Sequence, residues 1–166
     1  MRKYALGAAF VALVLSAGVF SGHSRAYGQA EAADPIFGTW KMDLAKSVRN
    51  RDGKSTPFTE QATRVLTPEP DGLNMSVTNG PNGKPSAYSG KFDGKDYPDP
   101  RAPGQERTLA HWRVTPNMIV RLQKTKGVPT EWVVYTVSPD GNMLTANSWI
   151  PDKPQYVETQ VYTRAK

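Results

Sequence analysis

Residues 131–150 read EWVVYTVSPDGNMLTANSWI, and this stretch decides the fold class. Residues 131–137 and 143–150 are rich in β-branched and aromatic side chains that alternate with polar ones, which is the period of a β-strand. Between them, residues 138–142 combine Ser, Pro, Asp, Gly and Asn, the residue types of tight turns. The stretch therefore predicts two antiparallel strands joined as a hairpin.

The same rhythm continues on both sides of this hairpin, and no segment shows the period of a convincing amphipathic helix. Short links rich in Gly, Pro, Asn and Asp separate most of the runs, while residues 43–58 form a polar connection and residues 93–104 a proline-rich irregular segment. Closing a meander into a barrel removes its exposed edges. We therefore predict an all-β, antiparallel up-and-down barrel of about eight to nine strands, with a sandwich as the alternative. The predicted strands are residues 36–42, 59–67, 73–78, 86–92, 106–114, 118–125, 131–137, 143–150 and 156–164.

The first thirty residues resemble a targeting segment. Arg2 and Lys3 precede an uncharged apolar run over residues 4–20, and small residues follow at positions that a signal peptidase reads. We predict a signal peptide over residues 1–30, with cleavage near 26–33, and a single domain over residues 34–166. The alternative is an uncleaved anchor, because the apolar run is close to the shortest that spans a bilayer. Cleavage would yield an exported protein, periplasmic or extracellular, with no stable membrane insertion.

Composition excludes several classes of partner and stabilising bond. The chain has no Cys, so its stability depends on its core and hydrogen bonds, and lipid attachment at Cys is excluded. Its net charge of +6 falls to +3 once Arg2, Lys3 and Arg25 are removed with the leader. The remaining Lys and Arg are scattered along the chain, which argues against a nucleic-acid partner.

Three short strings carry a resemblance to a known family. They are FGTWKM at residues 37–42, extended to GTWKMDLAKS at residues 38–47, KFDGKDYP at residues 91–98, and QVYTR at residues 160–164. Together they resemble the lipocalin and fatty-acid-binding-protein (calycin) superfamily, and within it a group of small exported bacterial lipocalin-like proteins. The resemblance implies a barrel in which Gly38 and Trp40 belong to the structure of one closed end.

The resemblance breaks down at the position that would hold a ligand carboxylate. Fatty-acid-binding proteins carry an Arg-x-Tyr pair in the last strand, whereas this chain has Gln160 and Tyr162. A bidentate charge clamp on a carboxylate is therefore in doubt. Arg164, two residues further along the same face, is one substitute. Residues 43–57 are too polar and irregular to form the helical lid of those proteins.

Candidate ligand-binding residues follow from the expected inward faces of the strands. We expect Thr108, Ala110, Trp112 and Val114 to face inward on one strand, and Met118, Val120 and Leu122 to do so on the next. The alternative is that the rings simply fill the core, as in many small barrels. The candidates for contact with a ligand are Tyr88, Phe92, Trp112, Val120, Tyr135, Gln160 and Tyr162.

Few residues suggest catalysis or metal binding. His111 shares its strand face with Arg107, Leu109 and Arg113, so we expect it to face outward rather than bind haem. Asp93, Asp96 and Asp99 are expected to form turns rather than a cation site. We predict no metal site, no cofactor and no catalytic nucleophile, since the part of the chain after the leader has one His and no Cys.

The sequence leaves three functions open. The first is an exported binding module for a small apolar or amphipathic ligand. The second is a filled barrel acting through its loops on a protein partner in the cell envelope, as an inhibitor or assembly factor does. The third is an isomerase or cyclase built on the barrel, with Gln160 and Tyr162 as its best candidates; we expect no enzyme activity.

Overall fold

The computed structural model describes residues 34–166 as one all-β unit, and the predicted signal peptide lies outside the described residues. No helix with the length and hydropathy needed to cross a bilayer occurs among these residues. The strands are β1 Gly38–Met42, β2 Val48–Arg51, β3 Lys54–Pro57, β4 Ala62–Glu69, β5 Gly72–Asn79, β6 Ser86–Lys91, β7 Tyr97–Pro98, β8 Arg107–Thr115, β9 Met118–Thr125, β10 Val128–Val137, β11 Met143–Ile150 and β12 Lys153–Arg164.

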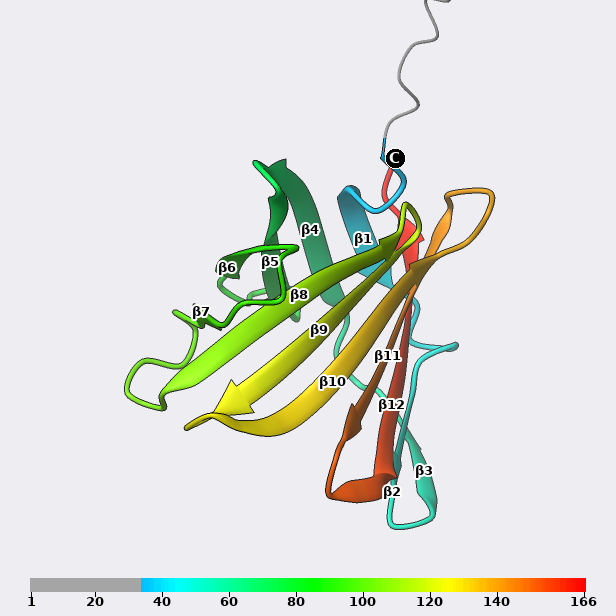
Figure 1. The fold of residues 1–166 in the computed structure, drawn as a ribbon. Helices are drawn as coiled ribbons and strands as arrows, with labels where there is room; N and C mark the ends of the chain where they lie inside the picture. The colour runs from blue at the N-terminus through cyan, green and yellow to red at the C-terminus, as the bar shows by residue number, and fades with distance from the viewer. Residues whose placement is uncertain (1–33) are drawn as a thin grey trace, which may run out of the picture. The chain divides into compact units, whose positions relative to one another are not determined.

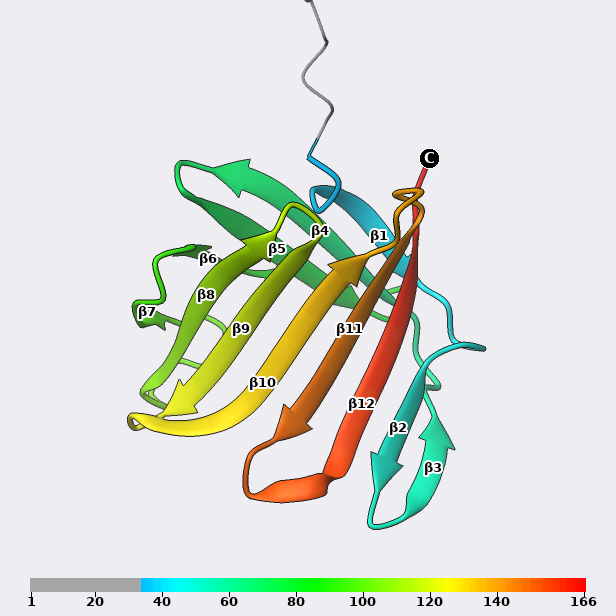
Figure 2. The same ribbon diagram turned by 45° about the vertical axis from the view of Figure 1, so that its right-hand side comes forward.

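The strands form a nearly closed antiparallel barrel. Ten of them follow one another in the order β6-β5-β4-β1-β12-β11-β10-β9-β8-β7. Figure 2 shows β8 to β12 as one curved sheet that faces β1, β4, β5 and β6 across the interior. Between β6 and β8 the described residues form no ladder, and one isolated bridge joins Asp93 to Trp112. The barrel therefore has a single seam.

β1 joins the two halves of the meander. Trp40 lies opposite Arg64 of β4 on one side and opposite Arg164 of β12 on the other. The β2–β3 hairpin is inserted in the chain between β1 and β4. All other strands that lie side by side in the barrel, apart from β1 and β12, follow one another in the chain, which confirms the expected up-and-down arrangement.

The barrel has more strands than the eight or nine that the sequence predicts. The polar connection after β1 forms the β2–β3 hairpin, in which β2 pairs with β12 at Val157, Glu158 and Thr159. Figure 1 shows this hairpin beside β12, at the end of the barrel away from the carboxyl terminus. The hairpin was missed because all residues of β3 are exposed, which removes the alternation of apolar and polar residues. The short β7 lies in the segment that we expected to be irregular.

One end of the barrel is closed by a packed core around Trp40. The indole Nε1 of Trp40 donates to the carbonyl of Ile36 at 3.2 Å, and the guanidinium of Arg164 lies 4.1 Å from the Trp40 ring centroid. Arg164 also donates to the carbonyls of Pro35 and Phe37. Gly38, with φ at +138°, leaves room for this arginine, since a Cβ there would lie 2.5 Å from Nη1 of Arg164. Any site for a ligand therefore lies toward the other end.

Candidate functional site

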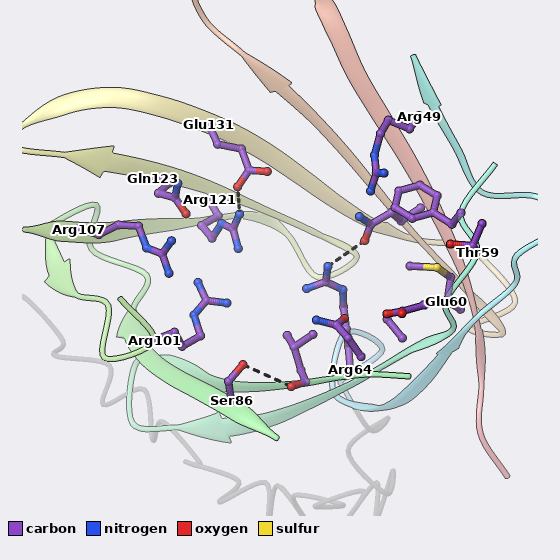
Figure 3. A pocket seen from close by; sticks show the side chains of 16 residues that line it. Arg49, Thr59, Glu60, Arg64, Ser86, Arg101, Arg107, Arg121, Gln123 and Glu131 are labelled. Atoms are coloured by element: carbon purple, nitrogen blue, oxygen red, sulfur yellow. Dashed lines mark hydrogen bonds and ion pairs between the residues drawn. The ribbon is translucent and has the colours of Figure 1, made fainter. Parts of the chain in front are cut away.

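A cavity of about 600 Å³ opens at the end of the barrel that carries β2 and β3. Its wall contains a few apolar side chains, among them Met42, Phe58 and Val77, but most of the lining is polar. Figure 3 shows guanidinium groups that reach into the cavity from different walls. The five arginines of the lining are Arg49, Arg64, Arg101, Arg107 and Arg121.

Among residues 34–166, Arg64 is the arginine of this cavity whose bonded partners are all neutral. β4 turns it inward because Ala62 and Leu66, two positions away on each side, are both buried. Its Nε donates to the hydroxyl of Tyr162 at 2.6 Å, and its Nη2 donates to Oε1 of Gln160 at 2.9 Å. Among residues 34–166, no carboxylate lies within ion-pair distance of Arg64. A guanidinium stays charged at any physiological pH. Arg64 thus carries a charge that no described carboxylate pairs directly, although Glu60 also belongs to the lining.

Tyr162 and Gln160 hold Arg64 in place as a small network. The Tyr162 hydroxyl donates to Oε1 of Gln160 at 2.6 Å, so this oxygen accepts hydrogen bonds from both Tyr162 and Arg64. Burial raises the pKa of Tyr162, and the adjacent Arg64 lowers it only in part. The phenol therefore remains a protonated donor at neutral pH.

Asp99 holds two further arginines at the cavity. Its side chain is 0% exposed, and it accepts from Nε and Nη2 of Arg101 at 2.7 Å and from Nε of Arg107 at 2.8 Å. Burial acts to raise the pKa of Asp99, but hydrogen bonds and charge from Arg101, together with Arg107, lower it overall. The guanidinium of Arg101 lies 4.1 Å from the ring centroid of Tyr88. The segment between β6 and β8 is thus tied to the seam by an ionised carboxylate.

Arg121 and Glu131 form an ion pair between β9 and β10. Arg121 is only 5% exposed, and its Nη1 donates to the Tyr88 hydroxyl at 3.4 Å. That hydroxyl donates in turn to the sulfur of Met75 at 3.1 Å, and burial raises the pKa of Tyr88 to about 12. A buried charge of this kind needs its carboxylate partner.

His111 lies inside the barrel, and the expectation that it faces outward is wrong. It is 0% exposed, stacks on Tyr88 with centroids 5.6 Å apart, and packs so closely on Gly90 that a Cβ there would lie 2.7 Å from Nδ1. Neither ring nitrogen has a hydrogen-bond partner among the described residues. Burial, followed by the charges of Arg121 and Arg101, lowers the pKa of His111 to about 3. The imidazole is therefore neutral at physiological pH.

The expected inward faces of β8 and β9 are also wrong, since Trp112 and Val120 lie on the outer face. The buried residues Leu109 and His111 occupy the opposite face of β8. Trp112 stacks on Trp132 at 5.9 Å, and Trp132 stacks on Trp149 at 6.3 Å, across the outside of the sheet. The inference failed because it placed the more apolar face of each strand inside, whereas this interior holds charged groups.

The other predicted ligand residues lie in different surroundings. Gln160 lines the cavity, while Tyr88, Tyr135 and Tyr162 are buried in the core next to the arginines. Phe92 packs against the core cluster beneath Arg113, outside the cavity lining. Separate turns and ion pairs involve Asp93, Asp96 and Asp99. Within residues 34–166 no group of acidic and His side chains is arranged to hold a metal ion.

The comparisons with known proteins show a fold and no family. No family model matches the chain, and no curated protein matches it. A fatty acid binding protein from Schistosoma mansoni, solved in complex with arachidonic acid, is similar with a TM-score of 0.61 at 16% identity, covering 80% of this chain and 97% of that one. A REP1-NXSQ fatty acid transporter gives a TM-score of 0.59 at 12% identity, covering 81% and 98%.

A third similar structure belongs to a protein described by a different property. It is a secretory abundant heat soluble protein from Ramazzottius varieornatus, with a TM-score of 0.58 at 8% identity, covering 79% of this chain and 96% of that one. These likenesses show that the barrel has the fold of the fatty-acid-binding and lipocalin type. At such low identity they leave the function to be argued from the cavity itself.

Proposed function

We propose that this protein binds a small amphipathic molecule through an acidic head group inside its barrel. The observation that carries the proposal is Arg64, a charged side chain at the cavity. Among residues 34–166 it bonds only to the neutral side chains of Tyr162, Gln160 and Met75. A carboxylate or similar anion at this position accepts charge-assisted hydrogen bonds, which are about twice as strong as neutral ones. It also compensates a charge that is costly to leave unpaired away from water.

The size and lining of the cavity agree with such a ligand. Its volume of about 600 Å³ falls within the usual range for small-molecule sites. Phe58, Val77 and Met42 supply apolar surface for the rest of the molecule. A purely apolar ligand would desolvate the arginines and give them nothing in return, so an acidic group is the better match.

The similar solved structures support the proposal through the fold. Two of them are described as a fatty acid binding protein and a fatty acid transporter, and the first holds arachidonic acid. In this chain Gln160 stands where the resemblance leads one to expect an arginine. Arg64 of β4 brings a guanidinium to the same Tyr162.

The test is direct binding of dodecanoate to the full chain, measured by isothermal titration calorimetry and native mass spectrometry. Arg64→Gln should weaken binding at least about tenfold, because hydrogen bonds to a charged group contribute about 1.5–3 kcal/mol. Lys91→Gln, which removes the same charge from an exposed position on β6, should bind as the unaltered protein does. Equal affinity of the Arg64→Gln and Lys91→Gln variants would rule out this head-group site.

We also propose that the protein is exported. The support is the sequence alone: Arg2 and Lys3, the apolar run over residues 4–20 and the small residues that follow. Amino-terminal sequencing of protein recovered from the producing cell should give a start between residues 26 and 34, whereas an intact Met1 would contradict cleavage.

A further inference from the structure

The cavity has a second cationic wall, distinct from the one that contains Arg64. Figure 3 shows the guanidinium groups of Arg101, Arg107 and Arg121 extending into the cavity from one side, while Arg64 extends from the other. Arg101 and Arg107 belong to the segment at the seam and to the start of β8, and Arg121 belongs to β9. Arg64 comes from β4, which lies several strands away round the barrel.

The positive charges of this wall exceed its negative ones. Arg121 is paired with Glu131, but Arg101 and Arg107 share the single carboxylate of Asp99. The side chain of Asp99 is fully buried behind these two arginines. Its single negative charge balances one of their two positive charges, so one positive charge remains on this wall of the cavity. Bidentate pairing with Asp99 explains the position of Arg101 without any ligand.

Arg107 has hydrogen-bonding capacity to spare. Its Nε donates to Asp99, and within residues 34–166 neither of its terminal nitrogens has a partner. Both terminal nitrogens therefore remain as donors for an anion, while Asp99 fixes the direction in which they point. Within the same residues Nε of Arg121 also lacks a partner, but this atom is buried, so the donors that this wall offers a ligand are argued from Arg107.

We propose that the ligand carries two acidic groups, one held by Arg64 with Tyr162 and the other by Arg107 beside Arg101 and Arg121. This inference rests on the proposed function and adds the chemical class of the ligand: an elongated molecule with an acidic group at each end. A ligand with one head group leaves the second wall with an uncompensated charge and unused donors. A dianion compensates both walls at once.

The first experiment compares ligands on the unaltered full chain. Isothermal titration calorimetry is run with matched pairs of a monocarboxylate and the dicarboxylate of the same chain length, octanoate with octanedioate and dodecanoate with dodecanedioate. We expect one of the dicarboxylates to bind at least about fivefold more tightly than its partner, since charge-assisted bonds are the stronger kind. The advantage should depend on length, because the two walls are a fixed distance apart.

The second experiment changes the wall. Arg107→Gln removes the charge and both free donors, so the preference for the dicarboxylate should fall to less than about half of its original value. Arg107→Lys keeps a charge that pairs with Asp99 but lacks the planar terminal nitrogens, and it should also reduce the preference. Lys91→Gln is the control for net charge, and thermal unfolding of each variant shows whether it is folded.

The outcomes separate this inference from the function on which it rests. Tight binding of both members of each pair with equal affinity would overturn the two-headed ligand and leave the head-group site at Arg64 standing. If none of the four acids binds, both the two-headed ligand and the head-group site at Arg64 are overturned. A preference for the dicarboxylate that persists in Arg107→Gln would place the second acidic group elsewhere and overturn the assignment of this wall.

Discussion

The two faces of the sheet formed by β8, β9, β10 and β11 differ in character where the sheet borders the cavity. Its inner face carries the buried His111 and, at the cavity, Arg121 and Glu131, whereas its outer face carries the stacked side chains of Trp112, Trp132 and Trp149. A sheet that merely covers a core shows the reverse, with apolar residues inside and polar residues outside. The polarity of a strand face therefore depends on what lies against it, and here part of the inner face lies against a polar cavity.

The two faces also obtain stability by different means. The inner charges are held by ion pairs and hydrogen bonds that must remain complete, because an unpartnered buried charge is costly. The outer tryptophans lose only contact area and stacking when one of them is removed. Changes on the inner face should therefore cost more than changes on the outer face, and three predictions test that order.

The largest effect should come from acid and act through His111. The unfolded chain protonates this residue below pH 6.5, while the folded protein keeps it neutral down to about pH 3. Between those values the unfolded state binds the extra proton, so the folded state loses stability as the pH falls. We expect a loss of up to about 4 kcal/mol over this window, at no more than about 1.4 kcal/mol per pH unit.

Chemical denaturation at a series of pH values measures this effect. His111→Leu should lose less stability than the unaltered protein between pH 6.5 and pH 3, because the variant has no proton to gain there. Nuclear magnetic resonance of the His111 ring in the unaltered protein gives an independent reading. An imidazole that titrates near its ordinary pKa would contradict the prediction.

The next effect should follow from breaking the buried ion pair on the inner face. Glu131→Gln leaves Arg121 without a carboxylate, and since Glu131 is itself partly exposed we expect a cost of about 2 to 3 kcal/mol in the free energy of unfolding. Asp96→Asn breaks the exposed pair with Lys124 and should cost less than about 1 kcal/mol. Equal costs for the two variants would show that Arg121 does not depend on Glu131.

The smallest effect should appear on the outer face. Trp132→Ala removes the ring that stacks on both Trp112 and Trp149, and we expect a cost of about 2 kcal/mol because the residue is only partly buried. Trp149→Ala should cost about half as much, since Trp149 is 36% exposed and stacks on one neighbour. Urea denaturation of both variants checks the order, and a larger cost at Trp149 would contradict it.

The sequence predicts where most strands lie, because turn residues and the period of two mark their limits well. The predicted segments 118–125 and 143–150 coincide with β9 and β11. What it does not predict is which side of β8 and β9 faces inward. That choice assumed an apolar interior, and the assumption fails where the interior contains a charged cavity. The β2–β3 hairpin was missed for a related reason, since β3 is exposed throughout and β2 has no buried residue to mark an apolar side.

The arginines of the cavity were missed as candidates, although one of them left a signal in the sequence. Arg64 stands between Ala62 and Leu66 at the spacing that places all three on one face of a strand. An arginine on the apolar face of a strand breaks the local pattern, and such breaks are expected at functional sites. Arg101 and Arg107 left no such signal, because they come together only through Asp99 at the seam.

The position of β1 between β4 and β12 has a consequence for how the chain folds. Arg164 reaches the carbonyl of Phe37 across 127 positions of the chain, and the network around Arg64 joins β4 to β12 over a similar span. Contacts between such distant segments require a large loss of chain entropy before they form, which slows folding. The hairpins made of neighbouring strands should therefore form early, and the step that limits the rate of folding should be the same step that assembles the head-group site.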